Sequence, residues 1–322
     1  MTRRLVILLV LVLAPFACAG EEAPKTVNES VQPETNESQD QRWEWTAEEE
    51  EQVVAIERQV KQNDDGSWEY KQGSYIFRSF VSERFTAEMA VYAELFENMF
   101  NGFLSTLPTK RELPENFRVE IMTFSKHQKR PPEIPVKFFE SDNSGIAKTT
   151  FDTLTRQLTS KIFLRFRDSD FSSAANERFR RSLQHEAAHI YTSAMTGMTA
   201  DGPIFLYEVV AYFFGWVNIR EWVDMRKVSV TAVRTDAKPR LSLAKYVTMG
   251  DKTFNDPSRE LNHAMAMNFA FFMMRDKARR ELLWTMMERI FAGQKPFTND
   301  EIKKLEPEWK KFNQSFPEGT SK

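Results

Sequence analysis

Apolar and polar residues alternate in short stretches in the first half of the chain, and helical spacing dominates the second half. Alternation over four to eight residues rich in β-branched and aromatic side chains predicts half-buried strands. We expect a hairpin at residues 68–77 and strands at 117–124, 147–151 and 161–166. Between the hairpin and the next strand, residues 86–107 have the apolar spacing of a long helix.

The second half is predicted to be mostly helical. Apolar residues recur with helical spacing over about 175–196, 203–222, 257–276 and 279–292, and two short helices are expected after Thr298. Near the start of the domain, Thr46 and Glu49 form a capping box that opens a helix over residues 46–62. Strands first and helices afterwards predict an α+β fold, with a small mixed sheet followed by a mostly helical half.

The first 19 residues have the pattern of a secretory signal peptide. Arg3 and Arg4 precede an apolar run at residues 5–14, and small residues follow at a cleavage site. The run is shorter than the roughly 20 residues that a membrane-spanning helix needs. Cys18 leaves a second possibility open, a bacterial lipoprotein tethered to the membrane through a lipidated Cys18, although Pro15 stands where an aliphatic residue is expected. Either alternative predicts export to the periplasm or cell envelope.

Residues 20–45 predict a disordered acidic linker, because few apolar side chains are available there to form a core. The whole chain has 44 Lys and Arg against 46 Asp and Glu. This near-neutral balance excludes a strongly basic nucleic-acid-binding protein. Cys18 is the single cysteine, so the domain at 46–320 has no disulfide framework, zinc finger or catalytic thiol.

One short motif carries the candidate chemistry. The sequence HEAAH at residues 185–189 is an HExxH motif inside the predicted helix at 175–196. Residues i and i+4 lie on one face of a helix, so His185 and His189 point to the same place. Glu186 is offset beside them, which is the arrangement of two zinc ligands with a neighbouring general base. The alternative is a pair of histidines that merely pack within the helix.

A catalytic zinc site needs a third protein ligand and one open position. Glu208, nineteen residues after His189, is our candidate, because a carboxylate on so apolar a helix is costly unless a cation neutralises it. Pro203 suits the first turn of that helix, and the loop before it reverses the chain. Asp201 in the loop is the alternative ligand, and Met195 excludes a ligand six residues after His189.

Such a site commonly adds a hydrogen-bond donor that stabilises the developing oxyanion. His263, on the predicted helix at 257–276, is the candidate for this catalytic role, and its alternative is a core histidine on a Met-rich helix. His127 lies in a basic loop, where we expect it to be exposed. The other candidate donors or supporting residues are Tyr191, Tyr207 and Tyr212.

HEAAH followed by Glu208 resembles the gluzincin metallopeptidases, at the spacing of their zinc aminopeptidase branch. Residues 205–211, FLYEVVA, resemble the Trp-Leu-x-Glu-Gly-x-Ala segment of that branch. Phe205 and Val209 replace its tryptophan and glycine. The chain has no Gly-x-Met-Glu-Asn segment, with which that branch binds a free amino terminus, so the resemblance does not imply aminopeptidase activity.

The chain resembles more closely a family of secreted bacterial proteins of unknown function, frequent in planctomycetes, that pair HExxH with a Pro-x-Trp-Leu-x-Glu-Gly-x-Ala segment. Residues 203–213 fit that segment apart from the same two replacements, and the similarity covers roughly residues 75–315. Its helical part includes residues 243–254, 263–273 and 305–309. The resemblance implies a zincin-like metallopeptidase domain, with catalytic helices at about 175–222 and a helical C-terminal half at 223–320.

Motif and resemblance together predict a zinc-dependent metallopeptidase that hydrolyses peptide bonds outside the cytoplasm. Its cofactor would be Zn²⁺ held by His185, His189 and Glu208, with Glu186 activating water and a peptide or protein as substrate. Two alternatives remain open. One is a catalytically inactive zincin-fold protein that binds or scaffolds in the cell envelope, and the other is a zinc hydrolase of peptidoglycan peptides.

Overall fold

The structure is a computed structural model of the 322-residue chain. The predicted signal peptide and acidic linker lie outside its described residues, apart from residues 11–12 and Trp45. Cys18, the candidate lipidation site, also lies outside them. The structure describes residues 11–12, 45–107, 112–125, 129–140, 145–152, 157–166, 173–196, 203–216, 241–255 and 259–314.

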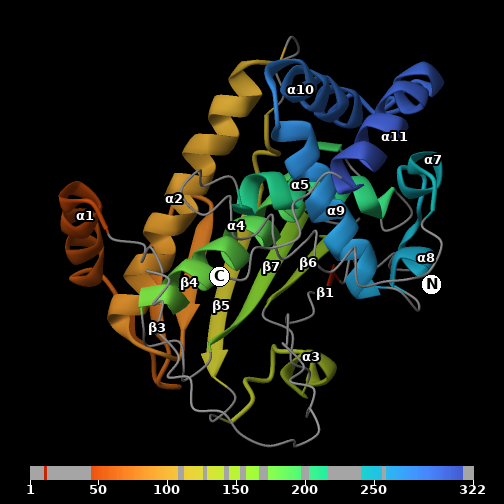
Figure 1. Ribbon diagram of the computed structural model, residues 1–322. Coiled ribbons are helices and arrows are strands. Elements are labelled where there is room, and N and C mark those ends of the chain that lie inside the picture. Colours follow the sequence, from red (N-terminus) through yellow and green to blue (C-terminus); the bar gives the residue numbers. More distant parts are fainter. Residues whose placement is uncertain are drawn as a thin grey trace, which may run out of the picture.

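A mixed sheet of seven strands forms the centre of the described molecule (Figure 1). Its spatial order is β1-β6-β7-β5-β4-β3-β2, in which β4, β5 and β7 are parallel neighbours and the other pairs are antiparallel. The predicted hairpin and the three predicted strands are all present. The strands are β1 (Leu11–Val12), β2 (Lys61–Gln62), β3 (Trp68–Gln72), β4 (Tyr75–Ser79), β5 (Arg118–Ser125), β6 (Gly145–Asp152) and β7 (Gln157–Phe166).

The remainder is mostly helical, which confirms the α+β class. The helices are α1 (Ala47–Glu57), α2 (Glu83–Ser105), α3 (Val136–Glu140), α4 (Ser173–Thr196), α5 (Ile204–Trp216), α7 (Leu243–Tyr246), α8 (Asp251–Asn255), α9 (Arg259–Met274), α10 (Lys277–Phe291) and α11 (Asn299–Gln314). The Thr46 capping box is present, but α1 ends before the predicted boundary at residue 62, because Lys61 and Gln62 pair with β3 instead.

Two helix predictions need correction. The long helix predicted from residue 86 begins at Glu83, because the Ser82 side chain caps it by accepting a hydrogen bond from the Phe85 N–H at 3.0 Å. The two short helices predicted after Thr298 are one continuous helix, α11, with Pro307 in its interior. The apolar stripe of α11 is buried on both sides of the proline, which holds the helix together across it: Leu305, Trp309 and Phe312.

The main core lies between the sheet and the helices α2 and α4, which pack against β3–β4 and β6–β7 respectively. Alternate side chains of the strands point into this core, and α1 packs on the outer side of α2 (Figure 1). A smaller second core on the opposite face of the sheet lies beneath α3, which is too short to be predicted from periodicity. Its members are Met122, Phe124, Ile134, Phe138, Ile146 and Phe163.

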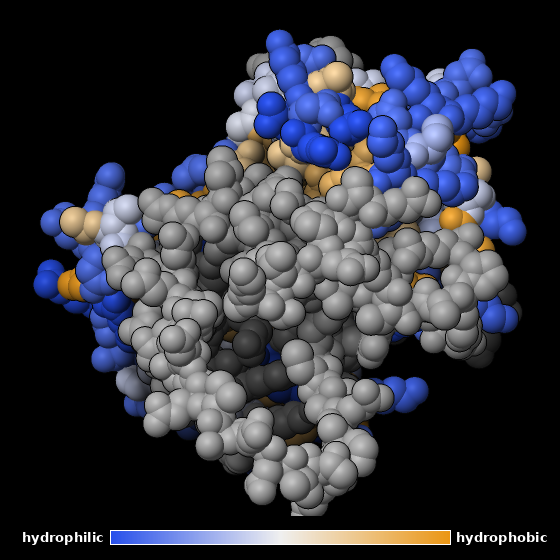
Figure 2. Space-filling model, in the orientation of Figure 1, coloured by the Kyte–Doolittle hydropathy of each residue, from blue (hydrophilic) through white to orange (hydrophobic). Residues whose placement is uncertain are grey.

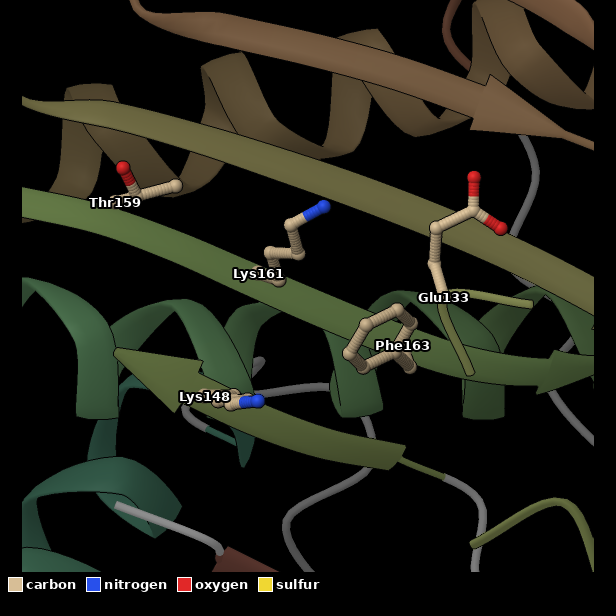
Figure 3. A pocket seen from close by; sticks show the side chains of 5 residues that line it. All are labelled: Glu133, Lys148, Thr159, Lys161 and Phe163. Atoms are coloured by element: carbon tan, nitrogen blue, oxygen red, sulfur yellow. The ribbon is translucent and has the colours of Figure 1, made fainter. Parts of the chain in front are cut away.

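A pocket opens on this opposite face, beside the second core (Figure 3). Lys148 and Lys161 are direct neighbours across β6 and β7, an unfavourable placement of like charges. Lys161 Nζ lies 2.5 Å from an oxygen of Glu120, which offsets part of that repulsion. Glu133 lies at the rim and pairs with Arg78 at 3.0 Å. The pocket and the helices α4 and α5 lie on opposite faces of the sheet.

The described surface over α10 and α11 is mostly hydrophilic, with apolar side chains visible between the two helices (Figure 2). Within the described ranges, the helices are too short or too polar for any of them to cross a lipid bilayer.

Candidate metal centre

The centre is built where α4 and α5 pack against each other. Residues 204–214 of α5 are buried on every side of the helix, as expected for a helix enclosed by α4 and α9. Pro203 precedes the first turn, and its carbonyl accepts the backbone N–H groups of Leu206 and Tyr207. This turn sets the direction of α5, so that Glu208 faces the histidines of α4.

The three predicted ligands converge within the core. His185 Nε2 and His189 Nε2 lie 3.1 Å apart. One Glu208 oxygen lies 3.2 Å from His185 Nε2, and the other lies 3.4 Å from His189 Nε2. All three side chains are almost completely buried. Among the described residues these three form a cluster whose ligand atoms lie within 4.8 Å of one another, whereas Asp201, the alternative ligand, lies outside the described residues.

The spacing of these atoms fits a tetrahedral zinc ion. Ligand bonds of about 2.0–2.1 Å at tetrahedral angles place neighbouring ligand atoms about 3.3 Å apart. The three distances of 3.1, 3.2 and 3.4 Å fall around that value. Both Glu208 oxygens and His185 Nδ1 are buried without a hydrogen bond of good geometry. Buried polar atoms are normally satisfied, and a cation between the ligands would satisfy the carboxylate.

Electrostatics place His185 and Glu208 in the protonation states that a metal requires. Burial lowers the pKa of His185 to about 4, so its imidazole is neutral at physiological pH. Burial raises the pKa of Glu208, but the surrounding histidines outweigh it and hold the pKa well below its usual value. A neutral imidazole and an ionised carboxylate are the forms that bind a metal ion.

Glu186 lies between the ligands and strand β6. Burial, followed by the nearby charge of Glu208, raises the pKa of Glu186 well above its usual value. The Ala147 N–H opposes this shift, although it lacks the alignment of a full hydrogen bond. A carboxylate with a raised pKa can accept a proton at neutral pH more readily than an exposed one.

Gly145 leaves the space that Glu186 occupies. A Cβ atom at position 145 would lie 3.1 Å from Glu186 Oε1 and 3.0 Å from a methyl carbon of Leu164. We expect Gly145→Ala to displace the carboxylate by a few tenths of an ångström and to slow any hydrolysis at the centre by less than the roughly 100-fold cost of a 1 Å misplacement, while metal content stays at the wild-type level. Parallel metal analysis and rate measurement check this result. Gly250→Ala is the control, since no atom lies within 4 Å of its added carbon.

Gly215 permits the close approach of α5 to α4. A Cβ atom there would lie 3.0 Å from His185 Cβ and 3.1 Å from the Arg181 carbonyl oxygen. We expect Gly215→Ala to lower the free energy of unfolding by about 1–3 kcal/mol and zinc affinity by about 10- to 100-fold. Denaturant titration and zinc titration measure the two effects. Gly102→Ala in α2 meets no neighbour and should instead be stabilising by about 0.5–1 kcal/mol; equal effects of both substitutions would contradict the close-approach argument.

The structure places His263 at the centre, where its imidazole contacts the carboxylate of Glu208. His263 Nδ1 lies 3.3 Å from a Glu208 oxygen and 3.2 Å from the Tyr212 hydroxyl. Tyr212 is one turn after Glu208 on α5, and its ring contacts His185 with centroids 4.7 Å apart. His263 is therefore no isolated core histidine, and it is placed to orient Glu208 as well as to donate a hydrogen bond.

The remaining candidates lie elsewhere or outside the described residues. Tyr191 points away from the ligands and hydrogen-bonds the buried Tyr75 hydroxyl. Burial raises the pKa of Tyr207, and a hydrogen bond with Thr196 at the end of α4 opposes that rise. The Tyr207 hydroxyl therefore lies beside Thr196 rather than among the ligands. His127 lies outside the described residues.

Arg259 is a residue near the centre that the sequence analysis missed. It lies four positions before His263, at the start of α9, so both side chains belong to the same face of that helix. Burial raises the pKa of both Glu186 and Tyr212, and the positive charge of Arg259 opposes that rise. The i, i+4 spacing from His263 was the one signal in the sequence that could have identified it.

No protein-family model, curated protein or solved structure matches this chain.

Proposed function

We propose that the protein is a zinc-dependent metallopeptidase of gluzincin type with a zincin-like domain, acting on peptides or proteins outside the cytoplasm. The observation that carries the proposal is the convergence of His185, His189 and Glu208 at zinc-ligand spacing, inside the core and beside a buried Glu186. Burial of two carboxylates so close together is unfavourable unless a cation accompanies them.

A zinc ion held by His185, His189 and Glu208 would supply Lewis-acid chemistry, lowering the pKa of a bound water to about 7 and polarising a substrate carbonyl. Glu186 would accept a proton from the attacking water and donate that proton to the nitrogen of the leaving amine. Burial raises the pKa of Glu186, and a more basic carboxylate is the better proton acceptor in the first of these steps. His263 and Tyr212 hydrogen-bond each other at 3.2 Å, and a polar hydrogen not used in that contact could stabilise the developing oxyanion.

The number of ligands favours hydrolysis over a structural zinc. Structural zinc sites have four protein ligands, whereas catalytic sites have three and keep one position for water or substrate. The ligand cluster among the described residues has three members, and His263, although 3.3 Å from Glu208, is not one of them.

Strand β6 is the place where we expect the substrate to bind. It is next to the edge of the sheet, and Ile146 and Ala147 pair with the two residues of β1 in an antiparallel ladder. An extended peptide can add to a strand edge in the same way through main-chain hydrogen bonds. Because Gly145 and Ala147 are the β6 residues beside Glu186, a peptide at this edge would present its carbonyl groups near the proposed base.

Metal analysis of the purified full chain, followed by an assay on an unfolded protein substrate, tests the proposal. We expect about one zinc per chain and cleavage that stops when a chelator removes the metal. Failure to bind zinc when it is supplied would overturn the proposal. Zinc binding without cleavage of any peptide would favour the inactive envelope protein, and cleavage restricted to peptidoglycan peptides would favour the envelope hydrolase.

A further inference from the structure

The pocket beside the second core brings polar and charged side chains together over β7 (Figure 3). Thr159, Lys161 and Phe163 are alternate residues of this strand, so they point to the same face of the sheet. Lys148 of β6 completes the wall, and Glu133 lies at the rim. The pocket has a volume of about 200 Å³. Because one water molecule takes up about 30 Å³, this space suits a small ligand group rather than a large molecule.

Positive charge is incompletely neutralised in the pocket. Lys148 and Lys161 are directly opposite each other across β6 and β7, and like charges in such positions are unfavourable. Lys161 has a carboxylate neighbour, since its Nζ lies 2.5 Å from an oxygen of Glu120. Lys148 has no such neighbour in the part of the chain that the structure describes. The Glu133 carboxylate pairs with Arg78 at 3.0 Å instead.

A further cation stands next to the pocket on β5. Arg118 is the residue of β5 that pairs with Thr159 of β7, so the two side chains are on one face of the sheet. Arg118 is exposed, and its Nη1 donates a hydrogen bond to the Phe117 carbonyl oxygen at 2.8 Å. Strand β7 lies between β5 and β6, and neighbouring strands are about 4.8 Å apart. An anion over Thr159 would therefore have Arg118 on one side and Lys148 on the other.

We propose that this pocket binds a phosphate group, held by the ammonium groups of Lys148 and Lys161 and by the hydroxyl of Thr159. Lysine suits this role, because its ammonium group is a compact charge with three hydrogen-bond donors. Two facing lysines match a phosphate, which carries between one and two negative charges at neutral pH, better than a carboxylate with one. The bound anion would also relieve the repulsion between the lysines, which Glu120 offsets only in part.

The phosphate has two possible sources, free inorganic phosphate or a small phosphate ester. Phe163 places an apolar ring in the same pocket, and this ring offers a contact surface to the carbon atoms of an ester. Inorganic phosphate and glycerol phosphate are therefore the two probes. Tighter binding of the ester would identify the ester as the ligand, and equal binding would show that the phosphate group alone is recognised.

Equilibrium dialysis of the full chain with each probe tests the proposal, after metal has been removed so that a metal ion contributes no phosphate binding. We expect about one saturable site per chain. Lys148→Gln should weaken Kd about 10- to 100-fold, the usual loss for a hydrogen bond to a charged group, whereas Lys148→Arg should keep most of the affinity. Lys252→Gln, at an exposed position in α8, is the control and should bind phosphate like the wild type.

Thermal unfolding gives a second measurement on the same variants. Without phosphate, Lys148→Gln should unfold about 1–3 °C above the wild type, because one of two facing like charges has been removed. Saturating phosphate should stabilise the wild type more than the variant, and chloride at the same ionic strength should not reproduce this difference. No saturable binding of either probe, or equal affinity of wild type and Lys148→Gln, would overturn the proposal and leave the proposed peptidase function unaffected.

Discussion

Glu186→Gln should keep its zinc and lose turnover by two to four orders of magnitude, the usual effect of removing a general base. Glutamine has nearly the volume of glutamate, so it can occupy the space that Gly145 leaves beside β6. Glu186 lies outside the ligand cluster, and its replacement therefore removes no metal ligand. Metal analysis and the cleavage rate of one peptide, measured on the same preparation, check both parts.

Retention of full activity by Glu186→Gln would contradict our assignment of the base and would identify the HExxH centre as structural. A loss of zinc together with activity would place Glu186 among the ligands instead. Glu88→Gln is a suitable control, because Glu88 is also a buried helix carboxylate, but it pairs with Arg84 on α2 and is not a member of the ligand cluster.

Glu208→Ala should lose metal affinity first and activity with it. The variant removes one of three ligands, and ligands that bind only the folded state stabilise it by mass action. At free zinc about 1,000-fold above Kd, the wild type gains roughly 4 kcal/mol in its free energy of unfolding, and the variant should lose most of this gain. Without metal the variant should also be less stable at neutral pH: burial raises the pKa of Glu208, but the surrounding histidines outweigh it and hold the pKa well below its usual value, so the ionised carboxylate stabilises the folded state.

Zinc titrations monitored by thermal unfolding measure this difference. Asp201→Ala is the control, and we expect its metal content to stay close to wild type. A Glu208→Ala variant that keeps full zinc while Asp201→Ala loses it would show that the third ligand comes from the loop, and the gluzincin assignment would fail with it.

The ligand cluster could be predicted from the sequence because its parts are local. The spacing of His185 and His189 is a property of any α-helix, and Glu208 was conspicuous as a lone carboxylate in an apolar helix. The strands at 117–124 and 161–166 were likewise predictable, because alternation along one segment reveals a half-buried strand without knowledge of its neighbours.

The sequence did not reveal which segments lie side by side. The parallel pairing of β5 with both β4 and β7 joins residues far apart in the chain, and no local pattern encodes that choice. The roles of Gly145 and Gly215 depend on the same long-range packing, since each matters only for the atom that approaches it from another element. Arg259 was missed for the same reason, because its charge affects the pKa of Glu186, a residue 73 positions earlier in the chain.

The edge of β6 has a consequence for solubility. Among the described residues, only Leu11 and Val12 pair with its outer side, and both belong to the segment predicted to be cleaved on export. The mature protein would then expose a row of backbone N–H and C=O groups, which can template pairing between copies of a chain. The half-buried Lys148 on this strand opposes such pairing by charge repulsion. An occupied edge should therefore protect the protein from self-association, and light scattering during storage with and without a bound, uncleaved peptide would measure that protection.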